Sequence, residues 1–185
     1  MKKKIITPDF FIGNLGSPEA NKEILSFCPS DFNQEALVEN FDDKPDHRDR
    51  KCLLSWLEVS ESNEFIETGL KTIIQNVNDM IWKMELNNVW ETSIQFAKYE
   101  GKGDHFCWHR DTYDDIDCDR KISVVYCLSK KSDYTGGEFE IKKEDGSVYK
   151  IKFDLGDFIV FPSTTLHRVK ALRTGKRMTM VGWIN

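Results

Sequence analysis

The sequence has no apolar run longer than five residues, whereas a membrane-spanning helix needs about 20. It also lacks the apolar segment of a secretory signal peptide, because only Ile5 and Ile6 separate the lysines at positions 2–4 from Thr7 and Pro8. No internal repeat, low-complexity segment or linker divides the 185 residues. These absences predict a single domain over residues 1–185, in a cytoplasmic protein that has no membrane partner.

Cysteine and histidine are both scarce. The five cysteines form no Cys-X-X-Cys pair and are odd in number, which favours reduced thiols over a disulfide framework. Only four histidines are available as imidazole ligands. The 26 basic and 31 acidic residues give a net charge of −5, which disfavours nucleic acid as the main partner. Apolar residues make up 39% of the chain, enough for a folded core.

The chain changes character near its middle. Residues 1–92 are mixed and predict a helical and mixed N-terminal support, while residues 93–185 predict the β core. A short helix is expected over residues 17–27, with Ser17 as its cap and Pro18 in its first turn. A long helix is expected over residues 62–86, because apolar residues spaced by three and four form one stripe that packs against a sheet.

Short apolar segments separated by turn signals follow Asn88. Many short strands at this spacing favour a mainly β (α+β) fold of the jelly-roll or a related barrel type. The predicted strands cover residues 92–99, 105–111, 121–128, 138–142, 148–153, 157–161, 167–171 and 177–184.

Two potential metal ligands lie close together in the segment His109-Arg110-Asp111. Side chains two residues apart on a strand share one face, so His109 and Asp111 can bind one cation. His167 begins a predicted strand far along the chain, and a jelly roll brings such distant strands together. His47 lies in a charged loop, where we expect a solvated surface histidine.

Two histidines and one carboxylate, with the opposite face open, form the facial triad of non-haem Fe(II) oxygenases. The sequence therefore predicts an iron site made by His109, Asp111 and His167. Arg177 follows on the next predicted strand, and a guanidinium can form two parallel hydrogen bonds with a carboxylate. We assign Arg177 to the distal carboxylate of a dicarboxylic keto acid whose other end binds the iron.

A larger set of residues resembles the prolyl 4-hydroxylase-like branch of the 2-oxoglutarate- and Fe(II)-dependent dioxygenases. The resemblance extends over residues 94–184. Within this branch, the sequence is most similar to the bacterial Fe(II)-dependent hydroxylases of the PKHX type. It rests on Tyr99, His109, Asp111, His167, Arg177 and Trp183, and on the segments Asp-Tyr-Thr-Gly-Gly-Glu-Phe at 133–139 and Gly-Asp-Phe-Ile-Val-Phe-Pro at 156–162.

The resemblance implies a double-stranded β-helix core with supporting N-terminal helices. It implies Fe(II), 2-oxoglutarate and O2 as cofactor and cosubstrates, with ascorbate as a further candidate, and no protein residue acting as general acid or base. Tyr99 would line the 2-oxoglutarate pocket beside Arg177. The implied substrate is a prolyl residue in a peptide or protein, and a free amino acid or another small molecule is the alternative. Cys127 departs from relatives that have a tyrosine there, which bears on cosubstrate affinity.

A zinc protein without redox activity is a second hypothesis. On a regular strand His105, Cys107, His109 and Asp111 would share one face, and a histidine–cysteine pair suits zinc. However, residues two apart on a strand lie about 6.6 Å apart, so one ion binds at most two of them. We therefore expect Cys107 to be a small buried side chain and His105 to be a hydrogen-bonded neighbour.

Two further hypotheses use the same fold. A nucleic-acid demethylase would need a basic groove, but acidic residues follow the metal motif at 114, 115, 117 and 119. We expect this acidic loop to be a solvated turn, and the alternative is that it selects a cationic peptide. A binding protein with an inactive metal site would have no reason to keep both the triad and Arg177.

Overall fold

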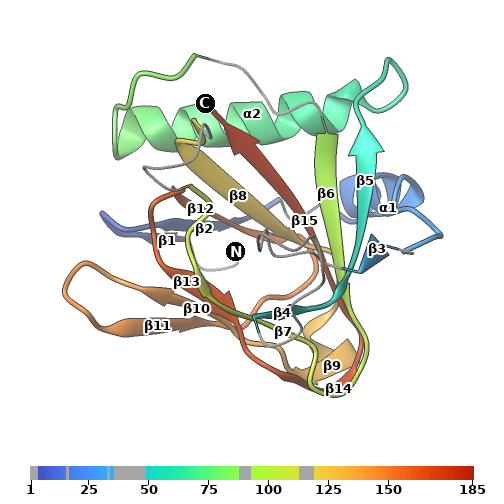
Figure 1. Ribbon diagram of the computed structural model, residues 1–185. Helices are drawn as coiled ribbons and strands as arrows, with labels where there is room; N and C mark the ends of the chain where they lie inside the picture. Colours follow the sequence, from blue (N-terminus) through green and yellow to red (C-terminus); the bar gives the residue numbers. More distant parts are fainter. Residues whose placement is uncertain (1–3, 16, 33, 36–48, 88–92, 113–118) are drawn as a thin grey trace.

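The computed structural model describes residues 4–15, 17–32, 34–35, 49–87, 93–112 and 119–185. Their strands form a two-stranded pair and two larger antiparallel sheets that pack face to face, and helix α2 crosses the outer face of the largest sheet (Figure 1). Neither described helix is long and apolar enough to cross a bilayer.

The larger sheet contains eight of the described strands, and its centre comes from the C-terminal half of the chain. In spatial order its strands are β1 (Ile5–Ile6), β2 (Phe11–Asn14), β12 (Asp157–Pro162), β8 (Ile122–Cys127), β15 (Arg177–Ile184), β6 (Ser93–Tyr99), β5 (Leu53–Glu58) and β3 (Gln34–Glu35).

The smaller sheet brings together strands that are distant in sequence. Its order is β11 (Val148–Ile151), β10 (Phe139–Lys142), β13 (His167–Val169), β7 (His105–His109) and β4 (Arg50–Lys51). A separate antiparallel pair consists of β14 (Leu172–Gly175) and β9 (Tyr134–Gly136). Strand β9 follows the 3-10 turn η1 (Lys131–Asp133). The β13–β7 pairing places His167 directly opposite His109.

Two apolar cores follow from the alternation of side chains along the strands. One lies between the two sheets and includes Tyr99, Cys127 and Phe139. The other lies between the larger sheet and the helices and includes Met180. Because successive residues of β15 point to opposite faces, Arg177 and Thr179 point with Val181 into the space between the sheets.

The two helices confirm most of the sequence-based prediction. Helix α1 (Pro18–Ser26) begins where expected, since the Ser17 hydroxyl accepts a 3.2 Å hydrogen bond from the Ala20 N–H. Helix α2 (Glu64–Met80) ends before residue 86, the predicted end. The reason is Asn78, whose side-chain amide bonds both the N–H and the carbonyl of Met84 at 2.9 and 2.8 Å and so turns the chain out of the helix.

All eight strands predicted after Asn88 are present, so the predicted mainly β, jelly-roll class is confirmed. The strand predicted over residues 105–111 ends at His109, two residues before Asp111. In the N-terminal half, β2 and β5 pair with β12 and β6 and extend the larger sheet.

Gly175 shapes the turn that leads into β15. Its φ is +83°, and a Cβ at this position would collide with the carbonyl oxygen of Asp133. We expect Gly175→Ala to lower the free energy of unfolding by more than about 2 kcal/mol, because positive φ and a backbone clash add up. Gly69→Ala is the control, since Gly69 lies in α2 and an added Cβ there has no neighbouring atom within 4 Å. This variant should raise the free energy of unfolding by about 0.5–1 kcal/mol. Denaturant unfolding of both variants measures the contrast, and equal effects would contradict it.

Candidate metal centre

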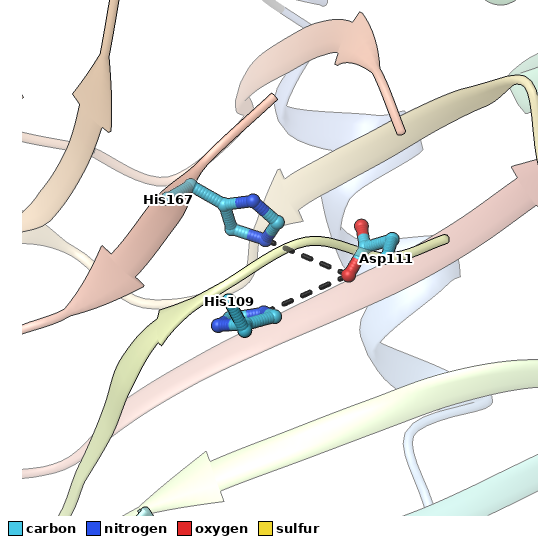
Figure 2. A group of neighbouring side chains, drawn as sticks. All are labelled: His109, Asp111 and His167. Carbon is cyan, nitrogen blue, oxygen red and sulfur yellow. Dashed lines mark ion pairs between the residues drawn. The ribbon is translucent and has the colours of Figure 1, made fainter. Parts of the chain in front are cut away.

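Three side chains from different positions in the chain meet at one end of the smaller sheet. His109 ends β7, Asp111 lies two residues beyond it, and His167 begins β13. The Nε2 atoms of His109 and His167 each lie 3.6 Å from the Oδ1 of Asp111 (Figure 2). The potential ligand atoms of all three residues lie within 4.8 Å of one another, so one cation can contact them all.

The backbone fixes which ring nitrogen of each histidine faces this point. His109 Nδ1 lies 2.9 Å from the carbonyl oxygen of Cys107, and His167 Nδ1 lies 2.9 Å from that of Thr165. A carbonyl only accepts hydrogen bonds, so each Nδ1 carries the proton and donates. In the neutral rings, each Nε2 is therefore left with a free lone pair directed at Asp111, as metal coordination requires.

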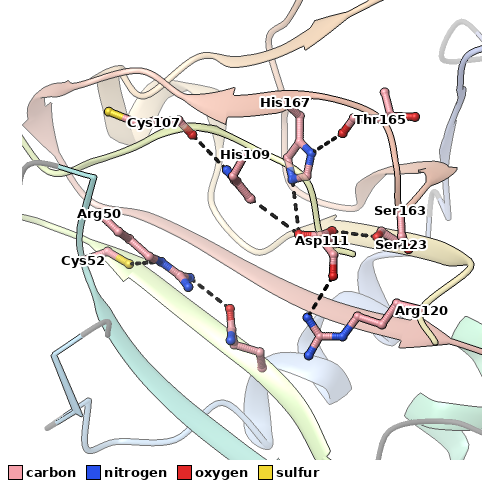
Figure 3. Close-up of polar contacts among 11 residues, drawn as sticks. Arg50, Cys52, Cys107, His109, Asp111, Arg120, Ser123, Ser163, Thr165 and His167 are labelled. Atoms are coloured by element: carbon pink, nitrogen blue, oxygen red, sulfur yellow. Dashed lines mark hydrogen bonds and ion pairs between the residues drawn. The ribbon is translucent and has the colours of Figure 1, made fainter. Parts of the chain in front are cut away.

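Asp111 is oriented by neighbours on β8 and after β12. The Ser123 hydroxyl donates to its Oδ2 at 2.6 Å and lies 2.9 Å from the Ser163 hydroxyl. The Asp111 N–H donates to the Ser163 carbonyl at 2.9 Å, and the Arg120 guanidinium donates to the Asp111 carbonyl at 3.3 Å (Figure 3). These contacts hold Oδ1, the other carboxylate oxygen, toward the histidines.

The protonation states suit a divalent cation. Burial, followed by the nearby His167, lowers the pKa of His109 to about 3. Burial alone would raise the pKa of Asp111, but His167, His109 and the Ser123 hydrogen bond outweigh it and lower this pKa below its usual value. Near neutral pH the cluster therefore offers a neutral His109 imidazole and an ionised carboxylate, which is a donor set for Fe(II) or Zn(II).

A β-bulge in β7 changes which residues accompany His109. His167 pairs with His109 but Val169 pairs with Phe106, so β7 contains one extra residue over this interval. As a result the rings of Phe106 and His109 stack, with centroids 3.4 Å apart. The expectation that His105, Cys107, His109 and Asp111 share one face is therefore wrong.

The remaining candidate ligands lie elsewhere. Cys107 is exposed, so the prediction of a buried thiol is wrong, and the bulge explains the difference. His105 is a hydrogen-bonded neighbour as expected, with its Nδ1 at 2.8 Å from the Gly103 carbonyl. His47, Cys118 and the acidic positions 114, 115 and 117 fall outside the described residues, and among the described ones only the triad forms such a group.

Arg177 lies on the strand pair that also contains Tyr99. It is 1% exposed, and none of its three guanidinium nitrogens has a hydrogen-bond partner among the described residues. The guanidinium carbon lies 5.2 Å from the centroid of the Tyr99 ring, and the two residues are paired across β15 and β6. A buried cation without a partner is costly, so a guanidinium placed in this way is suited to bind an anion.

Tyr99, Cys127 and Tyr134 all lie near Arg177, and the Tyr134 hydroxyl donates to the Phe153 carbonyl at 3.2 Å. Burial raises the pKa of Cys127 to about 11, so its thiol is neutral at physiological pH, and it donates to the Ser129 carbonyl at 3.2 Å. Burial also raises the pKa of Tyr99, whose side chain is 2% exposed. Trp183 is 4% exposed, and the Arg120 guanidinium lies 4.0 Å from its ring centroid.

Residues 94–185 match the family model of the 2OG-Fe(II) oxygenase superfamily. The chain belongs to this superfamily. The match spans both histidines, the aspartate and Arg177, and it agrees with the resemblance inferred from the sequence.

Curated relatives of this oxygenase are PKHD-type hydroxylases. One from Crocosphaera subtropica is 31% identical over 122 residues, which are 63% of this chain and 54% of the relative. One from Prochlorococcus marinus is 44% identical over 63 residues, which are 34% of this chain and 28% of the relative. The oxygenase chain thus spans about half or less of the length of these relatives.

Solved structures show the same fold over nearly the whole oxygenase. A Pseudomonas putida prolyl-4-hydroxylase matches with a TM-score of 0.72 and 18% identity, covering 96% of this chain and 92% of that one. A Trichoplax adhaerens prolyl hydroxylase, solved with a hypoxia inducible factor peptide fragment, matches with a TM-score of 0.74 and 21% identity, covering 96% and 84%. The expected prolyl 4-hydroxylase-like fold is therefore confirmed.

Two features near the triad were missed by sequence reasoning. Arg50 of β4 is 8% exposed and lies 4.3 Å from the Phe106 ring centroid, beside the ring that stacks on His109. Ser123 orients Asp111 from β8, although its place in a run of strand residues gave no sign of that role. Both depend on strand pairing across distant segments, which local patterning does not reveal.

Proposed function

We propose that the chain is an Fe(II)- and 2-oxoglutarate-dependent dioxygenase that hydroxylates an unactivated C–H bond, with succinate and CO2 as co-products. The observation that carries the proposal is the combination of the His–Asp–His cluster with Arg177, a buried cation that has no hydrogen-bond partner among the described residues. A zinc protein would use the cluster but would have no need for such a cation. The combination therefore supports a metal that binds a dianionic keto acid.

In this proposal His109, Asp111 and His167 hold Fe(II), while Arg177 and Tyr99 hold 2-oxoglutarate. When bound, these groups supply the oxygen activation that the protein side chains lack. The chain itself holds its ligands rigid through backbone and serine hydrogen bonds, and it surrounds the buried Arg177 with an apolar core between the sheets. No described side chain needs to act as a general base.

For the substrate, we propose a prolyl residue in a peptide or protein. The support comes from fold-level likeness to prolyl hydroxylases, one of them solved with a peptide fragment. A free amino acid or another small molecule is the second candidate. Ascorbate dependence and a cytoplasmic location stay predictions from the sequence.

We also propose that residues 1–92 support the dioxygenase core of residues 93–185 within one domain. Strand pairing favours this organisation, because β5 pairs with β6 and β4 pairs with β7. Arg50, Cys52 and Leu54 of the first half are buried against the second half.

Anaerobic titration with Fe(II) and 2-oxoglutarate tests the proposed function. We expect a weak visible absorption band, because the keto and carboxylate oxygens of 2-oxoglutarate chelate the iron through its open positions. Succinate, which lacks the keto oxygen, and Zn(II), which has no such transition, are the controls and should give no band. Bound Fe(II) without a 2-oxoglutarate-dependent band would contradict the proposal and favour the zinc-protein hypothesis.

A further inference from the structure

Arg50 of β4 is a second buried arginine near the metal centre, besides Arg177. Its guanidinium lies over Phe106, whose ring in turn stacks on His109. Figure 3 shows Arg50 beside the strand segment that contains His109. Its positive charge contributes to the low pKa of His109. Burial lowers the pKa of Arg50, but Cys52, Tyr99 and Asp111 outweigh burial and raise this pKa above its usual value.

A cysteine sulfur and a side-chain amide oxygen hold the Arg50 guanidinium in place. Its Nε donates to the sulfur of Cys52 at 3.3 Å (Figure 3). Its Nη2 donates to the amide oxygen of Gln95 at 3.0 Å. No carboxylate among the described residues forms an ion pair with it. A guanidinium has five N–H donors, so about three remain for a ligand.

Arg168 of β13 offers a comparison, because it also lies over an aromatic ring of β7 but has a structural partner. It lies over Trp108 of β7, with its guanidinium carbon 4.5 Å from the ring centroid. Its Nε and Nη2 both bind the Oε2 of Glu140, at 2.8 and 2.6 Å. Arg168 thus pairs with a carboxylate of the chain, whereas the more deeply buried Arg50 pairs with no carboxylate in the described ranges.

The lack of a carboxylate partner for Arg50 among the described residues points to a ligand. A buried cation without an anionic partner is unfavourable in general, and an incoming carboxylate removes that penalty and forms charge-assisted hydrogen bonds. Under the proposed function, both carboxylates of 2-oxoglutarate are already assigned, one to Arg177 and one to the metal. The carboxylate left for Arg50 then belongs to the molecule that is hydroxylated.

Building on the proposed function, we infer that Arg50 binds a carboxylate of the primary substrate close to the metal centre. The substrate is then anionic next to its reacting carbon. Two sources fit this chemistry: the α-carboxylate of a free amino acid, or an acidic side chain beside the target residue of a peptide. Arg50 acts as a specificity-determining residue that discriminates carboxylates from their neutral amides.

Binding to the protein loaded with Mn(II) and 2-oxoglutarate tests this inference without relying on turnover. One arm titrates the proteinogenic L-amino acids and their primary amides by calorimetry. The other titrates the capped tripeptides Gly-Pro-Asp and Gly-Pro-Asn. In one of the two arms we expect the carboxylate ligand to bind at least about ten-fold tighter than the matching amide. The arm that shows this preference tells whether the carboxylate comes from a free amino acid or from a peptide side chain.

Arg50→Gln should reduce that preference to less than about two-fold while changing 2-oxoglutarate affinity by less than about three-fold. Arg50→Lys should keep part of the preference, since it retains the charge but not the planar fork. Arg168→Gln is the matched control and should keep the full preference. Thermal unfolding verifies that each variant is folded, and Arg50→Lys carries the test if Arg50→Gln is not.

Three results would overturn the inference. These are no carboxylate preference in either arm, a preference that survives in Arg50→Gln, or a loss confined to 2-oxoglutarate affinity, which would assign Arg50 to the cosubstrate. Absence of Mn(II) and 2-oxoglutarate binding by the wild-type protein is a separate result. It would contradict the proposed function itself, and the inference would fall with it.

Discussion

Replacing Asp111 by alanine is expected to abolish metal-dependent activity and to weaken metal binding by more than about 100-fold. Asp111 is the only anionic member of the triad, and its Oδ1 lies 3.6 Å from both Nε2 atoms. Loss of an outer partner of a metal ligand typically costs about 10–100-fold in affinity, and loss of a ligand itself costs more. Calorimetric titration with Mn(II) measures the change directly.

Two further variants make this result specific. Asp145→Ala removes an exposed carboxylate that bonds only local groups, so it should leave metal affinity unchanged. Asp111→Asn keeps an oxygen that can accept from Ser123 but loses the charge, and it should bind metal more weakly than wild type. If a folded Asp111→Ala protein binds Mn(II) with wild-type affinity, Asp111 does not belong to the metal site.

The clustering of His109, Asp111 and His167 could be predicted from sequence, even though the local strand geometry assumed for residues 105–111 was partly wrong. The predicted strand over residues 105–111 assumes regular alternation, yet β7 contains a bulge and ends at His109. His109 and Asp111 still converge, because Asp111 is drawn toward the histidines by Ser123 and Ser163 rather than by strand alternation. The predicted clustering of the three side chains is therefore confirmed, although the regular strand assumed for residues 105–111 is not.

Features that depend on tertiary pairing were not predictable. Arg50 lies at the end of a charged segment that looks solvated in sequence, but pairing with Phe106 of β7 buries it. The end of α2 depends on a side-chain hydrogen bond from Asn78 to Met84, six residues away, which the apolar stripe does not encode. Periodic patterns report the buried faces of elements, whereas these details depend on single side-chain contacts.

Arg177→Met is expected to weaken 2-oxoglutarate binding by about 100-fold or more while changing Mn(II) affinity by less than about three-fold. A bidentate pair with a carboxylate contributes roughly 3 kcal/mol or more, which corresponds to about two factors of ten. Calorimetric titration of 2-oxoglutarate onto the Mn(II)-loaded protein measures this change, with Arg173→Met, an exposed position on β14, as the control.

The stability of the same variant separates an anion site from a structural arginine. Without 2-oxoglutarate, Arg177 is a buried cation whose nitrogens have no hydrogen-bond partner among the described residues, so an apolar side chain of similar length should keep or raise the melting temperature. With 2-oxoglutarate, only the wild-type protein should be stabilised, because the ligand binds the folded state alone. An unchanged cosubstrate titration would place the anchor elsewhere, and a clear loss of stability in the ligand-free variant would show that the fold itself depends on the guanidinium.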